Sequence, residues 1–452
     1  MTLLEKYNRM VPRYTSYPPA NFFDTAFGEA DARRLISDDA GRRPQSIALY
    51  VHIPFCRKVC HYCGCNTCGL GSGRQVAPYM EALRREVDMV AALMPDGIRA
   101  SEIHYGGGTP NVIDADTLIS FNSMMMSRFA PTADIETAIE CNPAYLDRRY
   151  ADRLLDAGFN RFSLGIQDFD ADVLRMVNRD PSALPVDRLV RHLQGSGASV
   201  NLDFIYGLPG QTPDGFARTM ERAADIRPDR LVTFSYAHVP WLKKNQTLLD
   251  ASRLPSADDK LLMFERARQI LGRAGYRQLG LDHFVLPDDS LSVAFEQGRL
   301  HRNFEGYCST SDSVYAFGSS AIAQLRGGFV QNVKSVTDYI STVSGGHLPV
   351  ERGISVGPEV RTVGIAIEQL MCNYRLRWDD VARAAQCSPH EARQACNAFG
   401  PQTLADMEAD GILSVSPEGI DVSAEGRIFV RNIAARLDPL AGTQGKRFST
   451  TA

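Results

Sequence analysis

The sequence predicts an α/β fold: a partial TIM-type barrel of six βα units with an N-terminal arm and a small, mostly helical C-terminal domain. From residue 46 onward, short β-rich apolar runs alternate with longer segments of helical periodicity. Strands that alternate with helices pair in parallel through right-handed crossovers, which favours a barrel or part of one. The residues with unusual chemistry follow these runs, at the end where such barrels carry their active sites.

Each βα unit is predicted from its own run and the helical segment behind it. The strands are short apolar runs that stop at a loop containing glycine or proline, and we expect them at residues 47–53, 101–105, 135–141, 161–166, 200–205 and 230–236. The helices show apolar residues three or four positions apart, and we expect them at residues 77–93, 115–129, 147–157, 186–193, 213–224 and 256–274.

The two flanks of the barrel lack this repeat. Residues 1–45 form a polar arm that contains the motif PRYTSYP at 12–18. The repeat fades through residues 313–324, so we assign residues 46–350 to the barrel and its extension. Helical periodicity returns at 360–370 and 390–399, which predicts a separate domain over residues 351–452.

Bulk composition narrows the classes of function. The 452 residues carry a net charge of -4 and no long run of lysine or arginine, so we expect no nucleic-acid partner. No stretch approaches 18 uncharged apolar residues, and the charged first residues do not resemble a signal peptide, so we expect a cytoplasmic protein without a membrane span. Half of the ten cysteines lie between Cys56 and Cys68, which indicates a metal site rather than a disulfide framework.

The cysteine cluster follows the first predicted strand. Cys56, Cys60 and Cys63 form a CxxxCxxC pattern, and three thiolates in so short a loop can hold an iron-sulfur cluster with one iron left open. The alternative is a structural zinc site, but zinc modules normally pair two CxxC knuckles or use histidines, and no such partner occurs in the sequence. Spacing alone leaves open whether Cys65 or Cys68 supplies a fourth ligand.

A glycine motif follows the second predicted strand. Residues 105–110 read YGGGTP, and three glycines remove the side chains that would keep a ligand away from the backbone. Glycine clusters also serve ordinary turns, so the motif alone is a weak signal. Because it lies one βα unit after the cysteine loop, the two together predict a binding site at this end of the barrel.

These motifs resemble the radical S-adenosylmethionine (SAM) superfamily and, along most of the chain, the family of oxygen-independent coproporphyrinogen III oxidases. The PRYTSYP arm and the extra cysteine in CGC narrow the resemblance to that family. The segments that carry it are PRYTSYP at 12–18, YVHIPFCRKVCHYCGCN at 50–66, GGGTP at 106–110, GIQDF at 165–169, NLDFIYGLPGQT at 201–212, YAHVP at 236–240 and LHRNFEGY at 300–307.

The resemblance implies a [4Fe-4S] cluster on Cys56, Cys60 and Cys63, with SAM on the open iron and a second SAM molecule nearby. Polar strand-end groups suit such a ligand, although aspartate and glutamate at these positions also commonly cap the following helix. His52 is expected to support the cluster loop as a hydrogen-bond donor. The positions that match SAM-binding positions of the family are Tyr50, Tyr62, Gly107, Gly108, Thr109, Glu140, Gln167, Arg179, Asp203, Ala237 and Ile322.

The resemblance further implies decarboxylation of two propionates of coproporphyrinogen III to vinyl groups, giving protoporphyrinogen IX, by a SAM-derived 5'-deoxyadenosyl radical. The substrate is anionic, and Arg13, Lys243, Lys244 and Arg302 are candidate carboxylate ligands. An unidentified electron donor and acceptor and a monomeric state are also implied. The alternatives are a related radical SAM methyltransferase, a heme-degrading enzyme and a heme-binding chaperone.

Overall fold

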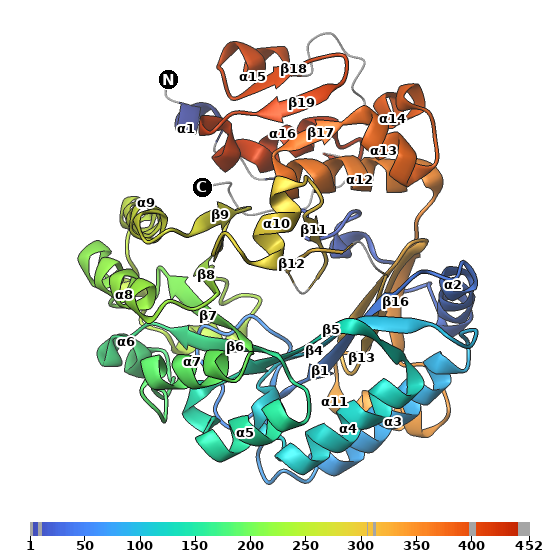
Figure 1. The fold of residues 1–452 in the computed structure, drawn as a ribbon, viewed down its shortest axis with the longest axis vertical. Coiled ribbons are helices and arrows are strands. Elements are labelled where there is room, and N and C mark those ends of the chain that lie inside the picture. The colour runs from blue at the N-terminus through green and yellow to red at the C-terminus, as the bar shows by residue number, and fades with distance from the viewer. Residues whose placement is uncertain (1–2, 8–10, 305, 311–312, 397–403, 442–452) are drawn as a thin grey trace.

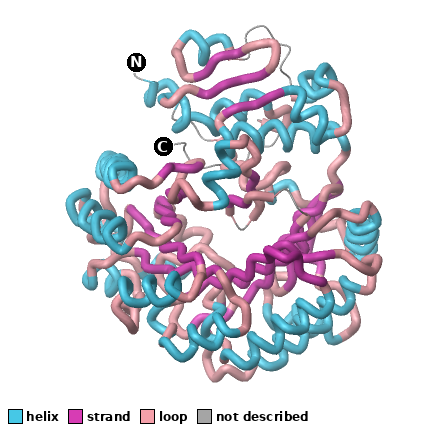
Figure 2. The backbone as a smooth tube through the Cα atoms, viewed as in Figure 1, coloured by secondary structure: helices cyan, strands magenta, loops and turns pink. Residues whose placement is uncertain are grey.

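The computed structural model describes residues 3–7, 11–304, 306–310, 313–396 and 404–441 (Figure 1). These residues form one twelve-stranded sheet with the order β16-β15-β14-β13-β1-β4-β5-β6-β7-β8-β10-β9. Figure 2 shows this sheet as an open arc with helices along its convex side, and the C-terminal domain lies above the opening.

The predicted parallel strands are all present. Neighbours in this part of the sheet are parallel throughout, as the sequence pattern predicts for βα units. The strands are β1 (Ile47–Ile53), β4 (Arg99–Gly107), β5 (Ala130–Cys141), β6 (Arg161–Gln167), β7 (Ser199–Tyr206) and β8 (Arg230–Ser235).

The predicted helices are also present and cover the convex face. Several begin at a side chain that accepts a hydrogen bond from the first-turn backbone, among them Asp114, Asp147, Thr212 and Ser256. Their buried apolar faces join the strands in one large core. The helices are α3 (Val76–Ala91), α4 (Ala115–Arg128), α5 (Arg148–Asp156), α7 (Val186–Gly195), α8 (Pro213–Ile226) and α9 (Ala257–Arg273).

Both edges of the sheet extend beyond the predicted barrel. β13 (Val314–Phe317) pairs in parallel with β1. Beyond β13 the sheet continues through three antiparallel strand pairs. The sequence analysis assigned an extension of the barrel to this part of the chain but did not predict its strands, because β13 pairs with a strand from a distant part of the chain and its neighbours are short. The other added elements are β14 (Ile322–Leu325), β15 (Gly328–Asn332), α11 (Val336–Ser344), β16 (Val350–Ser355), β9 (Arg277–Leu279), β10 (His283–Val285), α10 (Ser290–Glu296), β11 (His301–Arg302) and β12 (Tyr307–Cys308).

One part of the N-terminal arm packs on the sheet extension, and the other part packs on the C-terminal domain. α2 (Glu29–Gly41), which the sequence pattern did not predict, buries one face against the sheet extension, and its Asp39 carboxylate accepts a hydrogen bond from the Tyr315 hydroxyl at 2.8 Å. Before it, α1 (Leu3–Tyr7) and the PRYTSYP motif pack on the C-terminal domain. The hydroxyls of Tyr14 and Tyr17 donate to Asp438 at 2.9 and 2.6 Å.

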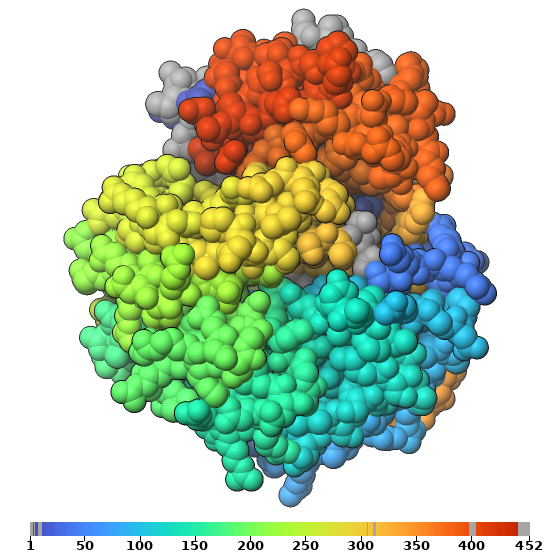
Figure 3. All heavy atoms as spheres, in the orientation of Figure 1, coloured from blue at the N-terminus to red at the C-terminus, as the bar shows by residue number. Residues whose placement is uncertain are grey.

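The C-terminal domain is mostly helical, as predicted. The predicted helix at 360–370 lies within α12 (Pro358–Asn373), and the predicted helix at 390–399 overlaps α14 (Pro389–Ala395), although residues 397–399 lie outside the described chain. Figure 3 shows this domain in contact with the segment around α10. Its other elements are α13 (Trp378–Ala385), α15 (Ala405–Ala409), α16 (Val430–Leu437) and a sheet of β17 (Arg375–Arg377), β19 (Gly419–Val422) and β18 (Leu413–Val415).

The domain limits at residues 45 and 350 stay predictions, and β16 begins at the second of them. None of the helices in the described chain combines the length and the apolar character needed to cross a membrane.

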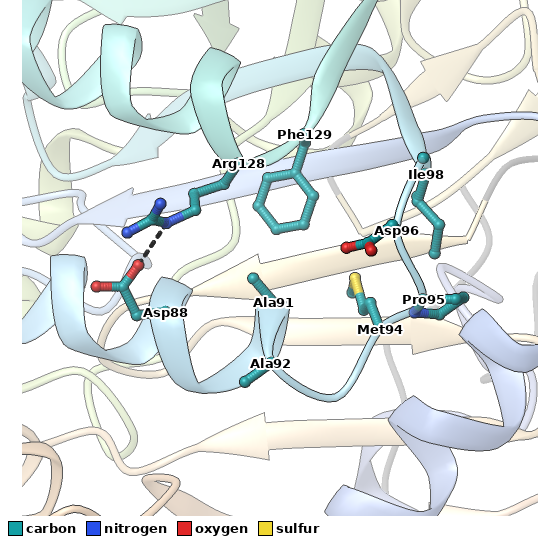
Figure 4. A pocket seen from close by; sticks show the side chains of 10 residues that line it. Asp88, Ala91, Ala92, Met94, Pro95, Asp96, Ile98, Arg128 and Phe129 are labelled. Carbon is teal, nitrogen blue, oxygen red and sulfur yellow. Dashed lines mark hydrogen bonds and ion pairs between the residues drawn. The ribbon is translucent and has the colours of Figure 1, made fainter.

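A surface pocket of about 390 Å³ lies where α3 ends and β4 begins, with the Asp88–Arg128 ion pair of 2.6 Å in its wall (Figure 4). The pocket lies at the amino-terminal end of the parallel strands, and the cysteine loop lies at their carboxyl-terminal end.

A buried carboxyl group joins the sheet extension to α3. Glu86 is 2% exposed and accepts hydrogen bonds from the Gly318 backbone, the Asn332 amide and the Tyr339 hydroxyl at 2.8, 2.6 and 2.5 Å. Burial raises the pKa of Glu86 to about 7, even though these hydrogen bonds favour the charged form. One titratable group therefore holds α3, β13, β15 and α11 together.

This network predicts a pH-dependent stability. The pKa of Glu86 is 4.5 in its ordinary state and about 7 in the fold, so its contribution is full below pH 4.5 and is lost as the pH rises through 7. The loss amounts to at most roughly 3 kcal/mol. Urea unfolding between pH 4.5 and 8 is expected to show this decline in the native chain and not in Glu86→Gln. Glu81→Gln, exposed on the same helix, is the control, and an unchanged slope in Glu86→Gln would contradict the assignment.

Candidate functional site

The cysteine loop begins where β1 ends, at the carboxyl edge of the parallel strands. A short parallel bridge between β2 (Phe55–Cys56) and β3 (Cys68–Gly69) closes it. The Cys68 amide donates to the Pro54 carbonyl at 2.9 Å, and the Leu70 amide donates to Cys56 at 2.7 Å. The loop is therefore held at both ends, with Cys56 and Cys60 buried and Cys63 half-buried.

Each of the three predicted cluster ligands has its own hydrogen-bond partner. The Thr109 hydroxyl donates to Cys56 Sγ at 3.3 Å, the Arg179 guanidinium donates to Cys60 Sγ at 3.5 Å, and Cys63 Sγ lies 3.9 Å from the Thr67 hydroxyl. Such donors stabilise thiolates, which are the form that binds iron.

Burial and neighbouring groups shift the pKa values of these thiols in different directions. Burial raises the pKa of Cys56 to about 11, while the hydrogen bond from Thr109 acts in the opposite direction. The hydrogen bond from Cys65 lowers the pKa of Cys63 to about 6. Cys65 is thus the immediate partner of Cys63, and its own pKa rises because that hydrogen bond favours its protonated form.

The three thiols do not converge on one point. Within the described chain, no three histidine, cysteine, aspartate or glutamate side chains lie as they would around a single metal ion. In a cuboidal cluster each cysteine binds a different iron, so its ligands surround a larger volume. Three thiolate donors in one loop fit an iron-sulfur cluster.

A segment that the sequence analysis did not assign to the site holds the cysteine loop from outside. The Asn245 side-chain amide donates to the carbonyls of Cys60, His61 and Cys63 at 3.2, 3.1 and 3.0 Å. The neighbouring Gln246 amide donates to Tyr62 at 3.0 Å. Because both contacts use backbone carbonyls of the loop, no residue pattern in the sequence indicates them.

An apolar cluster supports the same loop. Tyr62 packs against a small core formed by α6 (Ala171–Met176) and the segments after β7 and β8. The His61 amide donates to the Val177 carbonyl at 3.0 Å. The loop from the first strand therefore crosses the barrel mouth and rests on the later strands.

The glycine motif makes this crossing possible. The amides of Gly108 and Thr109 donate to the carbonyls of Ile53 and Phe55 at 2.8 and 3.0 Å. Gly107 has a φ of +111°, and a Cβ there would lie 2.5 Å from the His52 ring. A Cβ at Gly108 would lie 2.6 Å from the Pro54 carbonyl oxygen. The structure shows that these glycines let β4 touch the cysteine loop. The expectation that they also clear space for a ligand stays a prediction.

Glu140, at the end of β5, is fastened at both carboxylate oxygens. One accepts from the Gly107 amide at 3.0 Å, and the other lies 3.3 Å from His104 Nε2. Burial alone would raise the pKa of Glu140, but the hydrogen bonds from His104 and Gly107 hold it below its ordinary value. The group is therefore an ionised acceptor beside the glycine motif and does not cap a helix.

Three further predicted residues gather around Gly165 on the next strands. A Cβ at Gly165 would lie 2.7 Å from the Gln167 amide nitrogen and 2.8 Å from the Arg179 guanidinium, which donates to the Gly165 carbonyl. Asp203 lies opposite Gly165 in the β6–β7 register and accepts from Ser163 and Asn201 at 2.8 Å each. The structure therefore brings Gln167, Arg179 and Asp203 together.

The remaining predicted positions are more widely spread. The Tyr50 hydroxyl is 3.2 Å from His52 Nδ1, and His52 Nε2 is 3.0 Å from the Asn66 carbonyl, so His52 supports the cysteine loop through its backbone. Ala237 is exposed, and its carbonyl accepts from Gln246 at 3.3 Å. Ile322 lies in β14, beyond β13 in the sheet extension.

Two of the candidate cations have partners within the protein. Lys243 Nζ donates to the Cys65 carbonyl at 3.2 Å. The Arg302 guanidinium lies 5.1 Å from the centre of the Tyr307 ring, while its Nε makes no hydrogen bond in the described structure. Lys244 is exposed.

A barrel of parallel strands with three cysteines in the loop after its first strand defines the class of radical SAM enzymes. The family model of the radical SAM superfamily matches residues 50–223, from Tyr50 before the cysteine loop into α8. This class binds a [4Fe-4S] cluster and SAM, and the thiol donors described above fit that cluster.

Full-length relatives define the family. The oxygen-independent coproporphyrinogen III oxidase of Salmonella typhimurium is 38% identical, over 97% of this chain and 94% of that protein. Its counterpart in a Synechocystis species is 35% identical, over 98% and 96% of the two chains. The solved structure of coproporphyrinogen III oxidase from Escherichia coli, a radical SAM enzyme, matches with a TM-score of 0.88 and 34% identity over 95% of this chain and all of that one. This chain belongs to the family of oxygen-independent coproporphyrinogen III oxidases.

The Asn245 contacts predict a loss of cluster binding. Asn245→Ala removes the donor shared by three loop carbonyls, at a cost of about 1–3 kcal/mol in loop stability. We expect a lower iron content after anaerobic reconstitution and faster loss of iron to a chelator, with secondary structure unchanged. Thr247→Ala, whose hydroxyl donates only to Lys244 of the same turn, is the control, and equal iron retention in the two variants would argue against the clamp.

Proposed function

We propose that this chain decarboxylates two propionates of coproporphyrinogen III to vinyl groups and so forms protoporphyrinogen IX without oxygen. One observation carries the proposal: full-length likeness to enzymes of this name, with the three-cysteine loop closed at the carboxyl edge of the barrel. This makes the chain an oxidoreductase of porphyrin and heme biosynthesis.

The reaction requires removal of hydrogen from an unactivated carbon, which no side-chain acid or base can accomplish. The bound cluster and SAM supply a 5'-deoxyadenosyl radical for that purpose. The protein's residues hold these groups and keep water away. Cys56, Cys60 and Cys63 would hold the cluster. The Arg179 guanidinium compensates negative charge on Cys60, and the Thr109 hydroxyl stabilises the Cys56 thiolate by a hydrogen bond.

We further propose that SAM lies between the glycine motif and the ends of β5, β6 and β7. Ionised Glu140 supports this placement because it can accept from an ammonium group or a hydroxyl. The pKa of Asp203 is raised by burial, so a ligand hydroxyl or cation would stabilise its charged form. Two SAM molecules, as the family resemblance implies, would use the full set of predicted positions: Tyr50, Tyr62, Gly107, Gly108, Thr109, Glu140, Gln167, Arg179, Asp203, Ala237 and Ile322.

The full-length relatives favour this reaction over a radical SAM methyltransferase, a heme-degrading enzyme or a heme-binding chaperone. None of the ten cysteines forms a disulfide in the described structure, which supports the proposal that the enzyme works in the reducing cytoplasm. The donor and the acceptor of electrons are separate proteins or small molecules in this proposal, and the monomeric state stays a prediction.

The activity can be tested directly. Anaerobic incubation with dithionite, SAM and coproporphyrinogen III is expected to give protoporphyrinogen, detected by mass as protoporphyrin after oxidation, together with 5'-deoxyadenosine. Cys60→Ala should lose both products, because one corner of the cluster has no ligand. Cys387→Ala, in the C-terminal domain, should retain them. Deoxyadenosine without the vinyl product in the native chain would refute the proposed substrate.

The SAM placement predicts a binding defect without loss of the cluster. Glu140→Gln keeps the size of the side chain and removes its charge, so the affinity for SAM should fall about tenfold or more while the iron content stays unchanged. Equilibrium dialysis of SAM against the reconstituted protein measures this. Glu221→Gln, exposed on α8, is the control, and SAM affinity within twofold of the native value in Glu140→Gln would exclude the contact.

A further inference from the structure

An exposed apolar surface lies on the segment that holds the cysteine loop. Trp241, Leu242 and Leu248 are 81%, 72% and 65% exposed, more than any other large hydrophobic side chain in the described chain. We call them, with Lys243 and Lys244 between them, the tryptophan patch. Exposed aromatic and aliphatic groups close together are typical of contact surfaces rather than of a solvated loop.

The patch is one layer of side chains away from the cysteine loop. Asn245 and Gln246 lie in the same segment, and they point inward to the carbonyls of Cys60, Tyr62 and Cys63. Trp241, Leu242 and Leu248 on either side of them point outward into solvent, and Lys244 is exposed. The Lys243 ammonium lies closer to the cysteine loop, where it donates to the Cys65 carbonyl at 3.2 Å. A protein that bound here would therefore lie against the part of the surface that covers the cluster ligands.

The charge of the patch indicates the chemistry of its partner. Lys243 and Lys244 carry positive charge at this place on a chain whose net charge is -4. Lys58, in the cysteine loop, is paired with Asp180 at 2.8 Å, and this pair adds no net charge. Two lysines beside an exposed tryptophan complement a partner that presents carboxylates around an apolar contact. A second copy of the chain is disfavoured, because a symmetric contact would bring the lysines of both copies together.

We propose that the tryptophan patch is the docking site of a small acidic protein that carries a one-electron redox group and reduces this enzyme. The proposal rests on the proposed function, which requires an electron from outside. The carrier loses one electron and the enzyme gains it; no bond forms or breaks, and no proton moves. The patch thereby indicates the kind of electron donor, which the sequence did not identify.

Binding provides the first test. Fluorescence anisotropy of a labelled flavodoxin, chosen as an acidic one-electron carrier, measures its affinity for the reconstituted enzyme. Trp241→Ser and Lys244→Glu should each weaken binding about tenfold, and raising the salt concentration should weaken it in the native chain. The matched controls are Ile428→Ser, 47% exposed in the C-terminal domain, and Arg273→Glu, exposed in the last turn of α9.

A comparison of two reductants provides the second test. With reduced flavodoxin, formation of 5'-deoxyadenosine should slow about tenfold in Trp241→Ser and Leu242→Ser. With dithionite, which needs no docking surface, the same variants should stay within twofold of the native rate. Loss of activity with dithionite in the native chain would reject the proposed function instead of the docking site.

Several outcomes would overturn the docking proposal. They are equal losses with both reductants, equal flavodoxin binding by patch and control variants, and a native chain that neither binds nor is reduced by flavodoxin. A concentration-dependent dimer in sedimentation that Trp241→Ser abolishes would assign the patch to a second copy of the chain. A raised KM for coproporphyrinogen with dithionite would assign it to the substrate.

Discussion

The hydrogen bonds between the backbones of the glycine motif and the cysteine loop are the constraint on which the site depends. The amides of Gly108 and Thr109 reach the carbonyls of Ile53 and Phe55 only because β1 and β4 are parallel neighbours and no Cβ intervenes. The contact turns the loop across the barrel mouth. It also places the Thr109 hydroxyl on the Cys56 thiol.

The later strands then complete the site from the opposite side. The segments after β6 and β8 provide Arg179 and Asn245, which hold the loop by its sulfur and by its carbonyls. The amide contacts of Asn245 are modest in energy, about 0.5–1.5 kcal/mol for a neutral hydrogen bond, and a bond that involves a charged group such as Arg179 contributes about 1.5–3 kcal/mol. Together they make the loop a rigid part of the barrel, which a cluster with an open iron requires if SAM is to bind in one orientation.

The acidic side chains of the site are placed by hydrogen bonds and by burial so that they suit a charged ligand. Glu140 is held ionised by His104 and Gly107, while burial raises the pKa of Asp203. The arm and the C-terminal domain, joined through Tyr14, Tyr17 and Asp438, lie over the open side of the sheet. Substrate chemistry can thus be separated from the outer surface at Trp241, where an electron carrier would dock.

The sequence by itself determined the six βα units and the cysteine loop, and it placed that loop at the carboxyl end of the first strand. These features depend on local periodicity and on spacing along the chain. It also identified Glu140 and Asp203 as strand-end acids. Only the tertiary structure decided which groups meet: α2 on the sheet extension, Glu86 between α3 and β13, and Asn245 on the loop carbonyls. The physical reason is that these contacts join residues far apart in the chain, often through backbone atoms, which every residue type possesses.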